Sequence, residues 1–210
     1  MPITEVGRDE IFLLFALGEC ARAIAALDRV ETLAAKRTFD AARQLELREW
    51  ISVFDAIRMA LHFTGSVSRV FFPIWRGGKY EATSEIARTR AARLCQLTGV
   101  PSDHPIKERS LRDDVEHMDE RLDAWIGGPR RPFGAVENIV HADLQEITRN
   151  AVERMSPFIF YQESGEVAIF DNRAVIEEWR QSLLDVRDRI SAGFDAMLSE
   201  ANAEGRQTLT

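Results

Sequence analysis

The residues best suited to chemistry lie between positions 109 and 126, where acidic and basic residues surround one of the four histidines of the chain. On a single helix, Asp113, His117 and Arg121 would stand one above another, because residues at i, i+4 and i+8 share a face at about 100° per residue. A carboxylate beside an imidazole fixes the tautomer and the orientation of the ring, which suits proton transfer near neutral pH. The segment therefore predicts a general acid–base site centred on His117.

The same segment has the apolar spacing of a helix that is packed on one side. Apolar residues recur every three or four positions, at Leu111, Val115, Met118, Leu122 and Trp125. This stripe predicts one continuous helix over residues 109–126. Arg112 lies five residues before His117, roughly 140° away around a straight helix, so its side chain points elsewhere within one chain. Its spacing instead predicts an i, i+4 surface ion pair with Glu116.

Arg112 and His117, separated by four residues on a late helix of a helical domain, resemble the motif of the HEPN family, in which an arginine and a polar residue precede a histidine. The resemblance extends more loosely over residues 8–127. It implies a HEPN-like bundle of long antiparallel helices and a homodimer in which Arg112 of one chain meets His117 of the other. Many members of the family have asparagine after the arginine, whereas this chain has Asp113, which makes the site more acidic.

The resemblance implies a metal-independent endoribonuclease of the toxin or defence type. His117 would act as general base or acid while a ribose 2′-hydroxyl attacks the adjacent phosphate. Arg112 would stabilise the developing charge and Asp113 would orient His117. Further candidates for contacts with the substrate are Arg121, Glu116 and His104. The expected partners are RNA, a second copy of the chain and a cognate antitoxin, and the expected reaction uses no cofactor and no metal.

Two other interpretations stay open. Some members of the family keep the fold as a non-catalytic dimeric module that binds nucleotides or proteins, and the net charge of −7 favours this one, because broad nucleic-acid binding needs many cationic contacts to phosphate. Alternatively, Arg112 and His117 are solvated residues on an amphipathic helix and the resemblance is accidental. Convergence of two His117 residues across a twofold axis would support the nuclease. A distant pair of His117 residues would support the accidental match. A dimer whose motif cleft is blocked or acidic would support the non-catalytic module.

Length and composition suit an ordinary globular chain. A chain of 210 residues predicts one domain or one domain with an appendage, and 45% hydrophobic residues are ample for a core. No apolar run approaches the roughly 18 residues that a membrane helix needs, and the first residues lack the pattern of a secretory leader. We therefore expect a cytoplasmic protein without a membrane partner. Cys20 and Cys95 lack metal-binding spacing and predict buried free thiols.

Helices are the elements that would position the site. Apolar periodicity predicts three helices before the motif helix, over residues 8–36, 41–72 and 82–97. Gly99 should end the third as its C-cap. The best cationic patch of the chain lies on this third helix, at Arg88, Arg90 and Arg93. A solvated face is a more ordinary interpretation of these arginines than an RNA track.

The connection before this third helix is a predicted loop over residues 71–79, because Pro73 and the Gly77-Gly78 pair break helices. Arg76 and Lys79 are ordinarily solvated charges in such a loop, although they could line a cleft. The glycines lack the spacing of a phosphate-binding loop.

The remainder of the chain predicts a small β-structure and a last helix. Two aromatic and β-branched runs flank a glycine-containing turn, which predicts a β-hairpin over residues 157–170. Asp171 or Asn172 should cap a helix over residues 173–198 that packs back onto the bundle. Residues 136–144 fit either a strand or an irregular segment. His141, Asp143 and Glu146 lie close together in this region but have no metal-binding signature.

The predicted fold class is mainly α, with a small β-hairpin and a C-terminal helix. The predicted organisation has four parts: a helical HEPN-like bundle over residues 1–127, a linker and irregular segment over 128–156, the hairpin and C-terminal helix over 157–200, and a flexible tail over 201–210.

Overall fold

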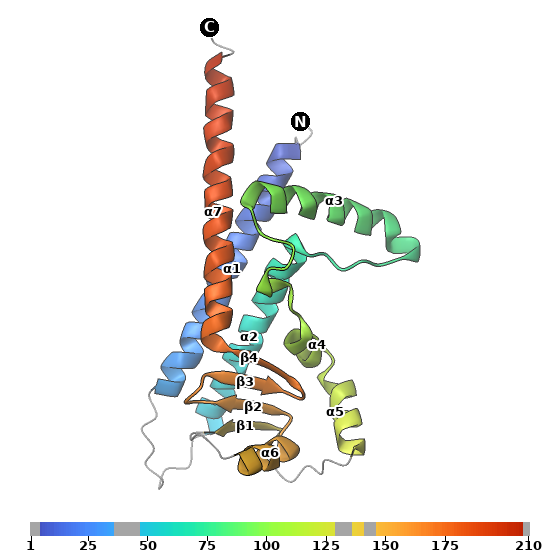
Figure 1. Ribbon diagram of the computed structural model, residues 1–210, viewed down its shortest axis with the longest axis vertical. Coiled ribbons are helices and arrows are strands. Elements are labelled where there is room, and N and C mark those ends of the chain that lie inside the picture. The colour runs from blue at the N-terminus through green and yellow to red at the C-terminus, as the bar shows by residue number, and fades with distance from the viewer. Residues whose placement is uncertain (1–4, 36–46, 129–135, 141–145, 208–210) are drawn as a thin grey trace. The chain divides into compact units, whose positions relative to one another are not determined.

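The computed structural model describes residues 5–35, 47–128, 136–140 and 146–207. Within these ranges the chain is mainly α-helical, with one small four-stranded mixed sheet and a long C-terminal helix that packs on the first helix (Figure 1). This confirms the fold class at the level of a mainly α protein with a small β-structure.

Two compact units make up the structure, and each combines segments that are distant in sequence. Unit 1 comprises Met1–Ile24, Phe63–Lys107 and Ser182–Thr210, and unit 2 comprises Ala25–His62 and Glu108–Gln181. The residues of the predicted motif belong to unit 2, whereas His104 belongs to unit 1.

Three long helices end or begin close to where the apolar periodicity predicts. Their bounds are Glu5–Ala35 for α1, Leu47–Phe71 for α2 and Glu81–Thr98 for α3. Residues 41–46, which were predicted to start the second helix, lie outside the described part of the chain. Gly99 ends α3 as predicted, with a φ of 68°, and its N–H donates to the Cys95 carbonyl at 2.8 Å. Glycine suits this position because it adopts positive φ without a steric penalty.

Unit 1 is a packed group of helices. Its buried apolar side chains come from α1, α2, α3 and the last helix, α7 (Ile176–Gln207), and include Leu13, Ala16, Val67, Leu94 and Ile190. At Gly193 of α7, an added Cβ would stand 3.1 Å from the Leu97 carbonyl oxygen. The close approach of α7 to the end of α3 therefore requires a residue without a side chain.

Unit 2 contains the sheet, whose strands lie in the order β1-β2-β3-β4. Their bounds are Glu137–Val140, Phe158–Tyr161, Glu166–Ile169 and Asn172–Val175. The first pair is parallel and the other two pairs are antiparallel. Helix α6 (Glu146–Met155) connects the parallel pair, because parallel strands need a crossover rather than a tight turn. The predicted hairpin is confirmed as β2 and β3, and part of the undecided segment forms β1.

Both faces of the sheet are packed. On one face, Ile159 and Tyr161 form an apolar cluster with Val140 and Ala168, against which Val152 of α6 packs. On the other, the ring of Phe158 meets Phe54 of α2 edge-on, with 4.7 Å between the ring centroids. The Arg58 guanidinium lies 5.5 Å from the centre of the same Phe158 ring. Burial on both faces explains why all four β2 residues are buried.

The start of the last helix differs from the prediction. Asn172 does not cap a helix but pairs with Ile169 as the first residue of β4. The intervening turn contains Phe170, whose φ is 51°, and the Phe170 N–H donates to the Pro157 carbonyl at 2.6 Å. Helix α7 begins later, at Ile176, and continues to Gln207, beyond the predicted end at residue 198.

The predicted continuous helix over residues 109–126 is wrong. Two helices stand in its place, α4 (Ser110–Glu116) and α5 (Met118–Gly127). His117 separates them, with a φ of −114° and a ψ of 32° that depart from helical values. The side chains on either side of His117 therefore do not follow the angular spacing of one straight helix.

No helix among the described residues is long and apolar enough to cross a membrane.

Candidate functional site at the junction of α4 and α5

His117 lies at the junction of the two short helices. Its backbone N–H donates to the Asp113 carbonyl at 3.0 Å, and its own carbonyl accepts from the Arg121 N–H at 2.9 Å. The backbone hydrogen bonds thus continue on both sides, while the dihedral angles of His117 change the direction of the chain. The His117 side chain is 59% exposed. The imidazole of His117 is therefore open to a ligand, as is the Asp113 carboxylate, whose side chain is 47% exposed.

The predicted contact between the Asp113 and His117 side chains does not form. The closest carboxylate to the imidazole is that of Glu120, with 3.6 Å between Nδ1 and Oε2. The Asp113 carboxylate instead accepts a hydrogen bond from Arg112 at 2.7 Å. Because the helix breaks at His117, the expected stack of Asp113, His117 and Arg121 is absent from this junction.

Arg112 is the buried cation of the motif, with its side chain only 6% exposed. The predicted ion pair with Glu116 is present, with 3.4 Å between Nε and Oε1, but it is not a surface pair. Its Nε and Nη1 atoms are both buried and have no hydrogen-bond partner among the described residues. The guanidinium thus lies beside two carboxylates of its own helix, and these two donors are shielded from solvent.

Asp114, to which the sequence assigned no role, is the buried acid of the site. Its carboxylate accepts a hydrogen bond from the Asn172 side chain at 2.7 Å and lies 3.2 Å from Nε of Arg121. Arg121 therefore pairs with Asp114 rather than with Asp113. Since Asn172 is the first residue of β4, Asp114 fastens α4 to the edge of the sheet. A buried carboxylate needs such partners, because an unpaired buried charge is costly.

His104, the secondary candidate, has a structural environment in unit 1. The ring is buried, and its Nδ1 accepts from the Ile106 N–H at 3.1 Å. Nε2 must then carry the proton, and it lies 3.0 Å from Oδ2 of Asp185 on α7. A hydrogen bond from Arg189, together with the one from His104, holds the pKa of Asp185 below its ordinary value. His104 therefore links the turn after α3 to α7.

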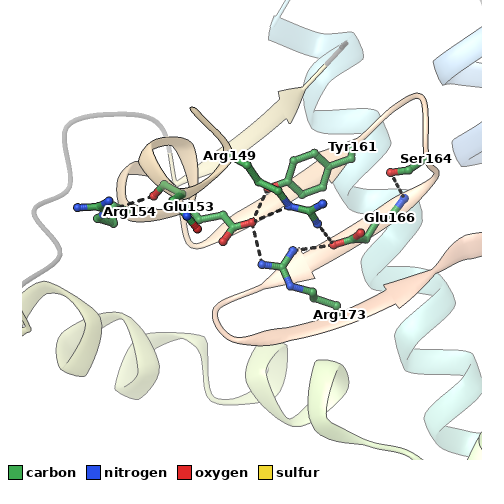
Figure 2. Close-up of polar contacts among 8 residues, drawn as sticks. Arg149, Glu153, Arg154, Tyr161, Ser164, Glu166 and Arg173 are labelled. Atoms are coloured by element: carbon green, nitrogen blue, oxygen red, sulfur yellow. Dashed lines mark hydrogen bonds and ion pairs between the residues drawn. The ribbon is translucent and has the colours of Figure 1, made fainter. Parts of the chain in front are cut away.

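A larger polar network, not predicted from the sequence, joins α6 to the sheet (Figure 2). Arg149 donates to Glu153 and to Glu166, and Arg173 binds the same two carboxylates, at 2.7 and 2.6 Å. The Tyr161 hydroxyl donates to Glu153 at 2.8 Å, and the Arg149 guanidinium lies 4.6 Å from the centre of its ring. Only the i, i+4 spacing of Arg149 and Glu153 is visible in the sequence. The other contacts depend on the strand pairing.

The electrostatics of this network suit a structural role. Partial burial would raise the pKa of Glu153 and Glu166, but the hydrogen bonds from Arg149 and Arg173 outweigh this and hold both below their ordinary value. Burial and the bond to Glu153 raise the pKa of Tyr161 to about 12. Near neutral pH the carboxylates are ionised and the phenol is protonated, so none of the three is poised to exchange a proton.

No protein-family model, curated protein or solved structure matches this chain. The resemblance to the HEPN family therefore rests on the motif residues quoted above and stays a prediction.

The described part of the chain contains no group of three or more His, Cys, Asp or Glu side chains placed to hold a metal ion. His141 and Asp143 lie outside the described residues. Cys20 and Cys95 are free thiols, but only Cys20 is buried as predicted, whereas Cys95 is partly exposed. Burial raises the pKa of both, to about 12 for Cys20, so neither is an activated nucleophile.

Proposed function

We propose that this chain is a non-catalytic, dimeric HEPN-like interaction module, in which the α4–α5 residues hold the fold together. The observation that carries the proposal is the burial of Arg112 between Asp113 and Glu116. A residue that stabilises a phosphorane must present free donors to the substrate. Within the part of the chain that the structure describes, only Nη2 of Arg112 makes a hydrogen bond, to Asp113, and Nε and Nη1 are buried in a side chain that is 6% exposed, so the guanidinium does not present its donors to a ligand.

The charge around Arg112 also disfavours phosphate. Arg112, Asp113 and Glu116 carry one positive and two negative charges, so together they have a net charge of −1. An incoming phosphate would compete with these two carboxylates for a guanidinium that is almost fully buried. Asp114 neutralises the nearby Arg121 at 3.2 Å. The junction thus lacks a free cation for the RNA backbone among the residues that the structure describes there.

A second copy of the chain is the proposed partner of α1. Three large apolar side chains, Ile11, Leu14 and Phe15, are exposed on one face of this helix. The same face continues through Gly18 and Ala21. An antiparallel copy that crosses near Gly18 would set the large side chains of each helix against the small residues of the other. Such size complementarity lets two helices approach closely.

The dimer is tested by light scattering of the wild-type protein and of Leu14→Glu during size-exclusion chromatography. We expect a dimer for the wild type and a monomer for the variant, because a carboxylate cannot be buried in an apolar interface without a partner. Met155→Glu places the same charge at another exposed apolar residue and should leave the dimer intact. A monomeric wild type, or a dimeric Leu14→Glu, would reject α1 as the dimer face.

A metal-independent endoribonuclease is the competing proposal, with RNA as substrate and an antitoxin as partner. The exposed His117 favours it, because this imidazole is open to solvent and could move a proton. In this alternative, His117 acts with Arg112 of a second chain, which would require the Arg112 side chain to leave its present partners.

One cleavage experiment separates the two proposals. A mixed RNA pool is incubated in EDTA with the wild-type protein, with His117→Ala and with His62→Ala, an exposed histidine on α2 that serves as the matched control. The non-catalytic module predicts intact RNA in all three samples. Cleavage by the wild type and by His62→Ala that leaves 2′,3′-cyclic phosphate ends, and its loss in folded His117→Ala, would instead establish the nuclease.

A further inference from the structure

Exposed aromatic and cationic side chains lie in the connection between α2 and α3, whose path Figure 1 shows, and on α3 itself. Trp75 and Tyr80 are 46% and 47% exposed. The exposed cations are Arg76, Lys79 and Arg88. We call these five residues the Trp75–Arg88 surface. All of them belong to unit 1.

Each aromatic ring of this surface is paired with a cation. The Arg88 guanidinium lies 5.2 Å from the centre of the Trp75 ring, and the Lys79 ammonium lies 5.0 Å from the centre of the Tyr80 ring. These distances are typical of cation–π contacts. Such pairs hold flat, exposed rings in place and put positive charge beside them.

The loop that carries Trp75 is fastened to α3. The buried Ser84 hydroxyl accepts from the Arg76 N–H at 3.0 Å and donates to the Arg76 carbonyl at 2.9 Å. Gly78 supplies the positive φ, 63°, that the following turn requires. These contacts fix the backbone between Trp75 and Tyr80, so a ligand would not have to order the loop on binding.

The charge of this surface is opposite to that of the whole chain. Its three cations face two nearby acids, Glu81 and Glu85, which leaves a net charge of +1 in a chain of −7. Of the predicted arginine track on α3, only Arg88 contributes. Arg93 donates two hydrogen bonds to Asp9, and Arg90 lies 3.9 Å from the centre of the Phe12 ring.

We propose that the Trp75–Arg88 surface binds single-stranded nucleic acid, with bases stacked on Trp75 and Tyr80 and phosphates contacting Arg76 and Lys79. Sequence-tolerant binding of single strands combines aromatic stacking with cations along the backbone, and this surface supplies both. A duplex does not fit as well, because its bases are already stacked on one another. The proposal goes beyond the function proposed above and uses no residue of the α4–α5 junction.

An anionic membrane is the other partner that aromatic and cationic residues could indicate. Segments that bind anionic lipid through charge usually carry about four to eight clustered Lys or Arg residues. This surface has three cations, and Glu81 and Glu85 lie among them. A nucleic-acid strand needs only discrete phosphate contacts between stacked bases. The charge pattern therefore favours the strand.

Fluorescence anisotropy with labelled 12-nucleotide oligouridylate and oligodeoxythymidylate tests the proposal. All proteins carry His117→Ala, so that cleavage cannot consume the RNA and the outcome does not depend on whether the chain is a nuclease. We expect Trp75→Ala to weaken binding about tenfold, and Trp75→Phe to keep it within about threefold because a ring remains. Arg154→Gln removes an exposed cation in unit 2 and should bind like the parent protein.

The phosphate contacts are tested by salt dependence. The slope of log affinity against log salt should become shallower by about 0.7 for each lost phosphate contact to a single strand, so Lys79→Gln should show this change and Arg154→Gln should not. Absence of binding by the parent protein would overturn the proposal. Binding by folded Trp75→Ala and by folded Lys79→Gln that is as tight as that of the parent protein would also overturn it. Binding to phosphatidylserine vesicles without binding to either oligonucleotide would overturn it in favour of a membrane.

Discussion

The α4–α5 junction contains Arg112 and the Trp75–Arg88 surface contains Arg88, and these two arginines differ sharply in burial. The Arg112 side chain is 6% exposed and lies beside two carboxylates, whereas that of Arg88 is 60% exposed, lies over an aromatic ring and has the exposed Glu85 carboxylate 3.8 Å away. The junction has the spacing of a known motif, and the other surface has no motif at all. The comparison shows that spacing selects residue types, while burial and partners decide whether they can meet a ligand.

Loss of a hydrogen bond to Asp114, the buried acid of the junction, should have the largest effect on the free energy of unfolding. Asn172→Ala removes the hydrogen bond to Asp114 and leaves this carboxylate with Arg121 alone. We expect the free energy of unfolding in urea to fall by about 2 kcal/mol, because a buried acceptor loses a partner. Asp119→Ala, at an exposed acid of α5, should change it by less than about 0.5 kcal/mol. Equal effects would show that Asp114 is not the buried anchor.

Replacing Arg112 or Arg88 by methionine compares the two arginines directly, with a smaller expected effect on the free energy of unfolding. Arg112→Met removes the hydrogen bond to Asp113 and the ion pair with Glu116 and should lower the free energy of unfolding by about 1 kcal/mol, since the loss of these contacts is partly offset by the removal of two buried donors without a hydrogen-bond partner. Arg88→Met should change it by less than about 0.5 kcal/mol. Greater destabilisation from Arg88→Met would reverse the proposed comparison.

The network of Figure 2 extends the comparison to acid conditions. The pKa of Glu153 and that of Glu166 are lower in the folded chain than their ordinary value of 4.5. The unfolded chain therefore binds more protons than the folded chain as the pH falls below 4.5. The stabilisation is complete above that pH and is lost progressively below it.

Glu166→Gln should accordingly flatten the acid side of a plot of urea midpoint against pH. Ser164→Ala, in the same turn, keeps both carboxylates and should retain the wild-type dependence. An unchanged acid dependence in Glu166→Gln would indicate that the network does not contribute to stability.

The long helices were predictable because burial on one side imposes a local apolar period. The predicted ranges 8–36 and 82–97 correspond to α1 (Glu5–Ala35) and α3 (Glu81–Thr98), and Gly99 is the predicted C-cap. The hairpin of β2 and β3 was also visible, because its two apolar runs flank a turn that contains Gly165. These features depend on residues that are near one another in sequence.

The errors concern features that depend on distant contacts. The apolar spacing of residues 111–125 fits one helix as well as two, so it could not reveal the break at His117. Strand β4 was missed because Phe170, a bulky residue, occupies a positive φ where turn rules expect glycine or asparagine. The role of Asp114 depends on Asn172, which is 58 residues away. The nuclease roles, the RNA and antitoxin partners and the domain division stay predictions.

Hydrogen–deuterium exchange of His117→Ala, with and without oligouridylate, compares the two regions in one experiment. The central claim is that ligand contact occurs at the exposed Trp75–Arg88 surface and not at the buried α4–α5 motif. It predicts that the oligonucleotide slows exchange in peptides that cover residues 73–88 and leaves residues 110–127 unchanged. Slower exchange over residues 110–127, with no change over residues 73–88, would contradict the claim. It would indicate that the α4–α5 motif is the nucleic-acid-binding site.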